Sequence, residues 1–236
     1  MSKETVLWGR YEELRPDQIE AIKSEHSVAY IPWGAIEYHG NHNPIGLDGI
    51  KAYGLCLELA QAAGGCVLPT VYHATSTIKA VKDLEHRRHS IEHSEELLKL
   101  LAEELFLQLA DEGFKVVLLL TGHAGQPHMD LLKEVAKECE KKCTGSKFLA
   151  IAEFDILDDS VLVANHSARG ETALQLHYRS DLVALEQLGE GDAPTLEKDA
   201  VWGEDPRLAT AEEGALIAAA FVRAGKAKVD ELLKSV

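Results

Sequence analysis

Short apolar runs along the chain alternate with segments of helical periodicity. The runs at 27–32, 66–71, 114–120 and 146–154 have the length of strands. The third run is almost continuously apolar, which is typical of a parallel strand that is covered on both faces. Pro69 lies inside the second run and predicts a strand that is broken or at an edge of the sheet, because proline cannot donate to a strand pairing. The pattern therefore predicts a mostly parallel sheet.

Helical periodicity fills most of the remaining chain. It predicts helices that begin near Pro16, cover 48–63, 90–111 and 127–142, begin near Gly170, and run from Thr210 to about Ala224, with a last apolar turn at 229–233. The polar segments 72–93 and 182–205 fit neither period. Strands that alternate with helices predict the α/β class, a layered fold with helices on both faces of the sheet. Since no repeat or linker divides the chain, we expect a single domain over residues 1–236.

The bulk composition narrows the possible partners. The chain has 236 residues, of which 46% are hydrophobic, enough for a substantial core. Lys and Arg number 24 against 39 Asp and Glu, a net charge of −15, which argues against nucleic-acid binding. The N-terminus has no secretory signal pattern, and no apolar stretch has the roughly 18 residues that cross a bilayer. Without a CxxC pattern among the four cysteines, we expect free thiols and a cytoplasmic protein with no membrane partner.

The segment 31–48, IPWGAIEYHGNHNPIGLD, carries an unusual density of metal-ligand side chains. Glu37, His39, His42 and Asp48 lie within a dozen residues, in a stretch with too much Gly and Pro to be a helix. Two carboxylates and two imidazoles form a ligand set that suits zinc, manganese or a similar divalent ion. His42 could equally be a residue that orients a ligand through a hydrogen bond.

Two further loops that follow predicted strands carry similar side chains. His123 follows the run at 114–120, and His166 and Glu171 follow the run at 146–154. In open α/β sheets ligands bind just beyond the carboxyl ends of the strands, so parallel neighbouring strands would bring these loops together. A lone histidine after a strand is more often structural, and His123 carries weight only together with the first loop. The separate cluster His86, His89 and His93 has arginines between its members, which favours a solvated face or a substrate-contacting rim over a second metal site.

Several segments together resemble the creatininase (creatinine amidohydrolase) family. GAIEYHGNHNPIGLD resembles its Glu-x-His-Gly-x-His-x-Pro signature followed by Asp, and TGHAGQ resembles its Asn-Gly-His-Gly-Gly-Asn loop. HSARGET resembles its His-Ala-Gly-x-x-Glu-Thr segment, and WGEDPRLATAEEG its Gly-Asp-Pro-x-x-Ala-Thr tail. The matches keep the family order from about residue 6 to 225. The first motif is specific, whereas the others would be weak alone.

The resemblance implies a layered α/β fold, a centre of two metal ions per subunit (zinc or manganese, with iron as a further option) and a homo-oligomer, often a hexamer. Asp48 would bridge the ions, Glu37 and His123 would hold one, and His39 would hold the other. His166 matches the family's catalytic histidine. Creatinine-hydrolysing members have a Glu two residues after the loop histidine, where this chain has Gly125. Glu171 is the expected substitute, as ligand and as part of the catalytic set, unless water fills that position.

Other departures from the family pattern concern the substrate. Thr121 and Gln126 stand where the family loop has asparagines, and Leu47 stands where it has threonine. With His42, we expect Thr121 and Gln126 to support the ligands or to contact the substrate. A Phe-Pro-Gly-Thr stretch of many members is absent, and residues 87–91 stand near its place. We expect the pocket wall to come from 72–93 and 182–205, where the match is poorest.

The expected chemistry is hydrolysis by water that two cations activate, with His166 as the general acid for the leaving nitrogen. The first hypothesis is an amidohydrolase that cleaves a non-peptide C–N bond of a small cyclic amide. The second is a hydrolase of a cyclic polyol ketone of the inosose type or of a formamide, which the breadth of the family allows. The third is a metal-stabilised assembly protein without catalysis, which the missing ligand at Gly125 suggests.

Overall fold

A six-stranded sheet forms the middle layer of the computed structural model, which describes residues 7–82, 84 and 88–236. The strands follow the order β1-β3-β2-β5-β6, and β4 also pairs with β2, beyond the end of β3. All pairings between the named strands are parallel. Their bounds are β1 (Trp8–Arg10), β2 (Val28–Gly34), β3 (Gly65–Val67), β4 (Val71–Tyr72), β5 (Val116–Thr121) and β6 (Lys147–Ala152).

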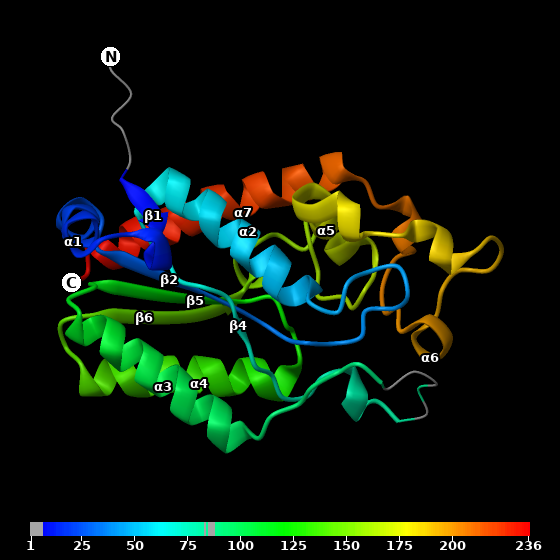
Figure 1. The fold of residues 1–236 in the computed structure, drawn as a ribbon, viewed down its shortest axis with the longest axis horizontal. Coiled ribbons are helices and arrows are strands. Elements are labelled where there is room, and N and C mark those ends of the chain that lie inside the picture. Colours follow the sequence, from blue (N-terminus) through cyan, green and yellow to red (C-terminus); the bar gives the residue numbers. More distant parts are fainter. Residues whose placement is uncertain (1–6, 83, 85–87) are drawn as a thin grey trace, which may run out of the picture.

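Helices cover both faces of this sheet. They are α1 (Pro16–Glu25), α2 (Leu47–Ala63), α3 (Glu95–Asp111), α4 (Gln126–Lys142), α5 (Arg169–Arg179), α6 (Leu196–Asp199) and α7 (Ala211–Leu233), with short 3₁₀ turns at Tyr11–Glu13, Ile78–Ala80, Glu153–Ile156, Ser180–Leu182, Leu185–Leu188 and Pro206–Leu208. In Figure 1, α2, α5 and α7 lie on one side of the strands, and α3 and α4 lie on the other. The predicted fold class, a mostly parallel sheet flanked by helices, is confirmed.

The two cores explain the continuous apolar runs. Successive side chains of a strand point to opposite faces. Val116, Leu118 and Leu120 of β5 pack in the core under α2, α5 and α7, and Val117 and Leu119 pack in the core over α3 and α4. All five are fully buried. A strand that is buried on both sides has no polar face to show, which is why its run does not alternate.

The differences from the sequence-based expectation include β1, the run around Pro69 and the end of α7. β1 has three residues, too few to show any alternation, and the sequence did not predict it. The run around Pro69 is broken into β3 and β4, as the proline predicted, yet β3 lies between β1 and β2. α7 continues to Leu233 instead of ending near Ala224, because packing of Gly225 against Leu59 and burial of Val229 outweigh the poor helix propensity of glycine.

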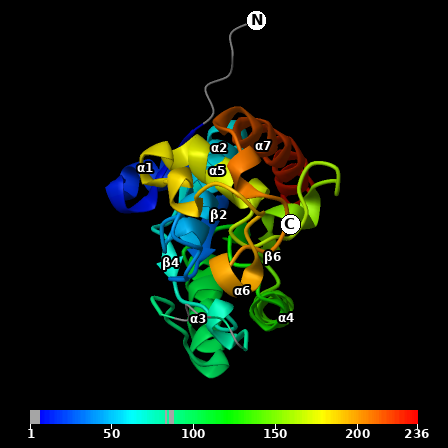
Figure 2. The same cartoon turned by 90° about the vertical axis from the view of Figure 1, so that its right-hand side faces the viewer.

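The carboxyl ends of β2, β5 and β6 meet at one edge of the sheet. Trp33 of β2 is level with Thr121 of β5, which is level with Ala152 of β6. The expectation that the strands before the two His-bearing loops are parallel neighbours is therefore confirmed. Figure 2 views the molecule from this edge, with α6 in front of it. Within the described part of the chain, no helix is both long and apolar enough to cross a membrane.

Candidate metal centre

The first turn of α2 packs directly on the ends of β2 and β5. A Cβ atom on Gly34 would lie 2.2 Å from the backbone nitrogen of Gly49, and one on Gly122 would lie 2.2 Å from the carbonyl oxygen of Asp48. Real Cβ atoms do not approach backbone so closely, so only glycine fits at these two strand ends. Because Gly34 and Gly122 have no side chains, α2 can approach both strand ends and place Asp48 between them. The side chain of Asp48 is 1% exposed there.

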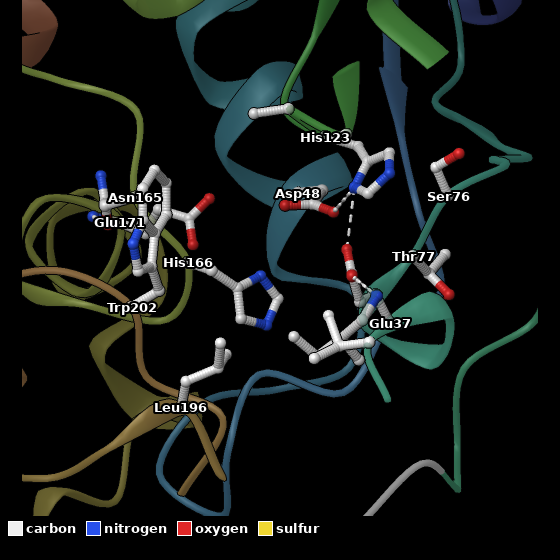
Figure 3. A pocket seen from close by; sticks show the side chains of 14 residues that line it. Glu37, Asp48, Ser76, Thr77, His123, Asn165, His166, Glu171, Leu196 and Trp202 are labelled. Carbon is white, nitrogen blue, oxygen red and sulfur yellow. Dashed lines mark hydrogen bonds and ion pairs between the residues drawn. The ribbon is translucent and has the colours of Figure 1, made fainter. Parts of the chain in front are cut away.

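One group of ligand-type atoms joins the loops after β2 and β5. His123 Nδ1 lies 2.8 Å from Glu37 Oε2 and 3.5 Å from Asp48 Oδ2 (Figure 3). His123 Nε2 donates to the carbonyl oxygen of Thr75 at 3.1 Å, so the proton of the neutral ring is on the far side and Nδ1 faces the carboxylates. The backbone N–H of Ile78 donates to Glu37 Oε1. Backbone groups thus orient both side chains toward Asp48.

A second group shares Asp48 with the first. His39 Nε2 lies 3.3 Å from Asp48 Oδ1 and 3.8 Å from Glu171 Oε2. His39 Nδ1 donates to the carbonyl oxygen of Glu37 at 3.0 Å, which leaves Nε2 as the free nitrogen. Glu171 lies in the first turn of α5, and its Oε2 also accepts from the backbone N–H of Ser167 at 2.7 Å. The segment after β6 therefore reaches the same point as the first loop.

The donor atoms of these groups are buried and short of partners. Glu37 Oε2, His39 Nε2 and Asp48 Oδ2 are inaccessible to solvent and make no hydrogen bond of acceptable geometry. Such unsatisfied polar atoms are costly unless something binds them. Each group offers its atoms within 4.8 Å of one another, and a third combination joins Glu37, His39 and His166. Carboxylate oxygens and imidazole nitrogens in this arrangement fit a divalent ion such as zinc or manganese.

The carboxylates and imidazoles of the cluster shift one another's pKa values. Burial alone would lower the pKa of His39, but Asp48, Glu171 and Glu37 together outweigh burial and raise this pKa to about 9. His123 follows the same logic, because Glu37 and Asp48 raise its pKa well above the usual range against the effect of burial. Burial would raise the pKa of Asp48, yet His39 and His123 hold it well below its ordinary value. Protons on the imidazoles therefore balance the carboxylates, a position that metal cations can take.

His166 stands beside this cluster. Its ring stacks on the ring of His39, with the centroids 4.4 Å apart. Its Nε2 donates to the carbonyl oxygen of Tyr38 at 3.0 Å, and its backbone pairs with Trp202 in an antiparallel bridge. Burial and the neighbouring His39 both lower the pKa of His166, so the ring is neutral at physiological pH. The structure therefore presents one neutral imidazole next to the ligand atoms.

A cavity of about 350 Å³ opens above these side chains (Figure 3). Its walls beyond the ligand atoms come mainly from Ser76, Thr77, Ile78, Val81, Asn165, Leu196 and Trp202. The expectation that 72–93 and 182–205 supply the pocket wall is therefore confirmed. Trp202 is 56% exposed, so a large aromatic ring stands at the mouth of the cavity, where a ligand could cover it.

Comparison with known proteins decides the family. The sequence model of the creatininase family, described as creatinine amidohydrolase, matches residues 12–228. The chain belongs to the creatininase family. As a member it is an amidohydrolase, which acts on C–N bonds other than peptide bonds. A search of curated protein sequences gives no match.

Solved creatininases share the fold. A crystal structure of creatinine amidohydrolase (creatininase) aligns with a TM-score of 0.80 at 19% identity and covers 97% of this chain and 98% of its own. A manganese form of creatininase aligns with a TM-score of 0.79 at 20% identity over 96% and 98%. A creatininase mutant of zinc–zinc type gives 0.80 at 20% identity over 97% and 98%. The buried donor groups of this creatininase-family chain suit the same two metals.

The three remaining site residues of the sequence analysis lie at different distances from the cavity. His42 is buried, and its Nε2 lies 2.9 Å from the carbonyl oxygen of Ser167, just before α5. Thr121 Oγ1 donates to the carbonyl oxygen of His123 at 2.9 Å and accepts from its N–H at 3.2 Å, so it braces the loop of this creatininase-family member. Gln126 is exposed, donates to Asp130 Oδ1 at 3.0 Å and does not line the cavity.

Two members of the histidine cluster at 86–93 are described by the structure, His89 and His93, and neither joins the centre. His86 lies outside the described residues. His89 is exposed, and neither it nor His93 lines the cavity. His93 packs instead against His73, with ring centroids 4.5 Å apart.

The sequence analysis missed Lys51 and Glu153. Both side chains are buried, and Lys51 Nζ lies 2.7 Å from Glu153 Oε1 and also donates to Glu171 Oε1. Burial would lower the pKa of Lys51, but Glu153 and Glu171 outweigh it and raise this pKa. One signal was available, since Lys51 stands one helical turn after Asp48 among the small and apolar residues of α2. Its partner could not be found without the fold.

Proposed function

We propose that this creatininase-family chain is a binuclear metal-dependent amidohydrolase that opens the C–N bond of a small, flat, cyclic amide. One observation carries the proposal: two buried groups of ligand atoms, Glu37/Asp48/His123 and His39/Asp48/Glu171, share one carboxylate. A shared carboxylate between two ligand sets is what a pair of divalent ions needs to sit side by side.

The site residues would have two roles, metal binding and proton transfer. Glu37 and His123 would hold one ion, His39 and Glu171 the other, and Asp48 both. When bound, two such cations supply an activated water and polarise a carbonyl. His166 is neutral, and because Nε2 donates to the carbonyl oxygen of Tyr38, its Nδ1 is the nitrogen that can take a proton and pass it to the leaving nitrogen.

The walls of the cavity support a flat substrate with few hydroxyl groups. Ile78, Val81 and Leu196 present apolar surface, and the indole of Trp202 offers a face on which a planar ring can stack. Asn165 also lines the cavity, but its Nδ2 donates to the carbonyl oxygen of Val163 at 3.0 Å and its Oδ1 accepts from the backbone N–H of Glu171 at 3.3 Å, so its amide supports the start of α5. A cyclic polyol ketone would bring hydroxyl groups against these apolar walls, which favours the amide.

The non-catalytic alternative has less support. A structural ion needs a closed ligand set, whereas these groups line an open cavity large enough for a small molecule. We further propose that residues 1–236 act as one catalytic domain, in the cytoplasm and as a homo-oligomer, with a hexamer as the expected state. Light scattering on the purified chain tests the assembly.

The test of the function compares metal content and turnover in the same samples. Metal-free protein is prepared with a chelator, reloaded with manganese or zinc, and assayed against panels of lactams and cyclic ureides, formamides and inosose-type ketones. We expect two ions per chain and metal-dependent hydrolysis confined to the cyclic amides. Glu37→Ala and His123→Ala should lose both an ion and the activity. Full activity in either variant, or in chelated wild type, would overturn the proposal, and turnover of ring ketones alone would replace it with the second hypothesis.

A further inference from the structure

A buried row of three charges connects α2 to α5 behind the candidate metal centre. Lys51 of α2 lies between two carboxylates, with its Nζ 2.7 Å from Glu153 Oε1 and in hydrogen-bond contact with Glu171 Oε1. The exposed fractions of Lys51, Glu153 and Glu171 are 1%, 2% and 3%. Of the three, only Glu171 lines the cavity. Lys51 and Glu153 therefore contact the ligand set through Glu171, and the charge of Lys51 also helps to lower the pKa of Asp48.

The contacts of Glu171 are divided between its two oxygens. Oε1 accepts from Lys51. Oε2 accepts from the backbone N–H of Ser167 and lies 3.8 Å from His39 Nε2. With one oxygen engaged by the ammonium group, the other is the oxygen available to an ion beside His39 and Asp48. The lysine thus selects both the rotamer of the carboxylate and the oxygen that it offers.

By resemblance to the creatininase family, a Glu ligand is expected at position 125, where this chain has glycine. A Cβ atom on Gly125 would lie 2.6 Å from the carbonyl oxygen of Ser76 and 2.7 Å from His123 Nε2. A side chain at this position would therefore displace the segment that holds His123. The second half of the centre depends on Glu171, which comes from a helix beyond β6 and needs a partner to hold it in place.

A buried ammonium group is an expensive way to hold a carboxylate unless its own charge is balanced. An unpaired buried charge costs several kcal/mol. Lys51 meets this condition because Glu153, which lies in the 3₁₀ turn after β6, pairs with it from the other side. The position of Lys51, one turn after Asp48 on the same helix, couples the shared ligand to the distant one.

We propose that Lys51 is a positioning residue that fixes Glu171 as a single-oxygen ligand and thereby sets the affinity of the His39/Asp48/Glu171 site, with Glu153 as its anchor. The inference rests on the proposed binuclear centre. It assigns Lys51 no contact with the substrate and no part in holding the first ion.

The test measures the two ion affinities separately by calorimetric titration of the metal-free full-length chain with manganese. In Lys51→Met the ion of the second site should bind about 10- to 100-fold more weakly, which is the usual effect of removing a residue that orients a ligand. The ion of the Glu37/Asp48/His123 site should keep its wild-type affinity. An unchanged second affinity, or an equal loss at both sites, would overturn the proposal.

A charge-balanced variant separates positioning from folding. Lys51→Met leaves two buried carboxylates facing each other, whereas Lys51→Met combined with Glu153→Leu removes the lysine and its anchor together, a replacement that proteins often tolerate. We expect thermal stability close to wild type in the double variant with the second ion still weakly bound. Recovery of the second affinity in the double variant would show that charge balance alone matters and would overturn the proposal.

The matched ligand variant keeps this inference apart from the proposed function. Glu171→Ala should bind one ion. If Glu171→Ala still binds two ions, or wild type binds only one, the binuclear assignment fails and the role of Lys51 falls with it. If wild type binds two ions and Glu171→Ala one, while Lys51→Met behaves as wild type, the function stands and only the role of Lys51 is wrong.

Discussion

The two halves of the candidate centre are built differently although they share Asp48. Glu37 and His123 come from loops after neighbouring strands, and backbone groups at Ile78 and Thr75 orient them. His39 faces Glu171, which comes from α5, and the side chain of Lys51 orients that carboxylate. One half is therefore held by main chain of the segment 75–78, which follows β4, and the other by a buried pairing of charges.

This difference in how the ligands are held indicates which ligands a substitution can move without disrupting the fold. Main-chain hydrogen bonds do not depend on the side chains of the residues that make them, so the path of the backbone after β4 secures the first half. A ligand that a buried lysine holds can be moved by a single substitution. We therefore expect substitutions around the second half to change the affinity for the metal, and with it the choice of metal.

The largest effect is expected where the halves meet. Asp48→Asn removes the charge that the two proposed ions would share, and we expect loss of both ions and a fall in kcat of at least about a thousandfold, since metal activation supplies several kcal/mol. Elemental analysis and kinetics on the same preparation measure this. Asp111→Asn at the exposed end of α3 serves as the control and should match wild type. Retention of one tightly bound ion in Asp48→Asn would show that the halves do not share their ligand.

The second-largest effect is expected for His166→Gln, which tests proton transfer without removing a proposed metal ligand. His166→Gln should lower kcat by about 100- to 10,000-fold, the range typical of a lost acid–base group, while both ions stay bound. His177→Gln on α5, whose imidazole pairs with Glu58 away from the cavity, is the control. Loss of an ion in His166→Gln would instead make His166 a ligand, in the combination with Glu37 and His39.

A third prediction concerns pH and the metal-free chain. The pKa of His39 is about 9 in the folded chain against an ordinary 6.5, so its protonation stabilises the metal-free fold fully below pH 6.5 and less as pH rises through 9. We expect the free energy of unfolding of chelated protein to fall by about 3 kcal/mol between these pH values. Urea unfolding at pH 6, 7.5 and 9 measures it. Manganese-loaded protein should lack this dependence, and chelated His39→Gln should show less of it; equal slopes in all three would contradict the assignment.

The smallest effect is expected for Gly125→Ala, which should disturb only the Glu37/Asp48/His123 site. In Gly125→Ala the added methyl group meets the carbonyl oxygen of Ser76 and His123 Nε2, so the hydrogen bond of His123 to Thr75 should weaken. We expect the first ion to bind about tenfold more weakly, in line with 1–3 kcal/mol for overpacking, and the second ion to be unaffected. Gly145→Ala, at a position where a Cβ atom would meet nothing within 4 Å, is the matched control. A larger loss at the second site would mean that the halves are not independent.

The residues of the first half of the site could be predicted from the sequence, whereas the residues that hold the second half could not. Glu37, His39 and Asp48 lie in one short segment, and the buried run before His123 marks a parallel neighbour of the strand before that segment, so their meeting follows from local pattern and sheet topology. Lys51 and Glu153 are ordinary charged residues in the sequence. Their pairing depends on how α2, α5 and the turn after β6 pack, which no local periodicity encodes.

The fold shows the same division. Long apolar runs predicted β5 and β6, and helical periodicity predicted α2 and α4, within one or two residues. β1 and the true start of α3 were missed. β1 is a three-residue strand held by pairing with β3, and α3 begins after Ser94, which accepts from the N–H of Leu97. Short strands and helix caps depend on single hydrogen bonds that a hydrophobic pattern does not reveal.

Anomalous diffraction from a manganese-soaked crystal of the wild-type chain tests the central claim most directly. We predict two peaks per chain, one between Glu37 and His123 and the other between His39 and Glu171, with Asp48 in contact with both. A chain without anomalous peaks at these residues, or with peaks only elsewhere on its surface, would contradict the account.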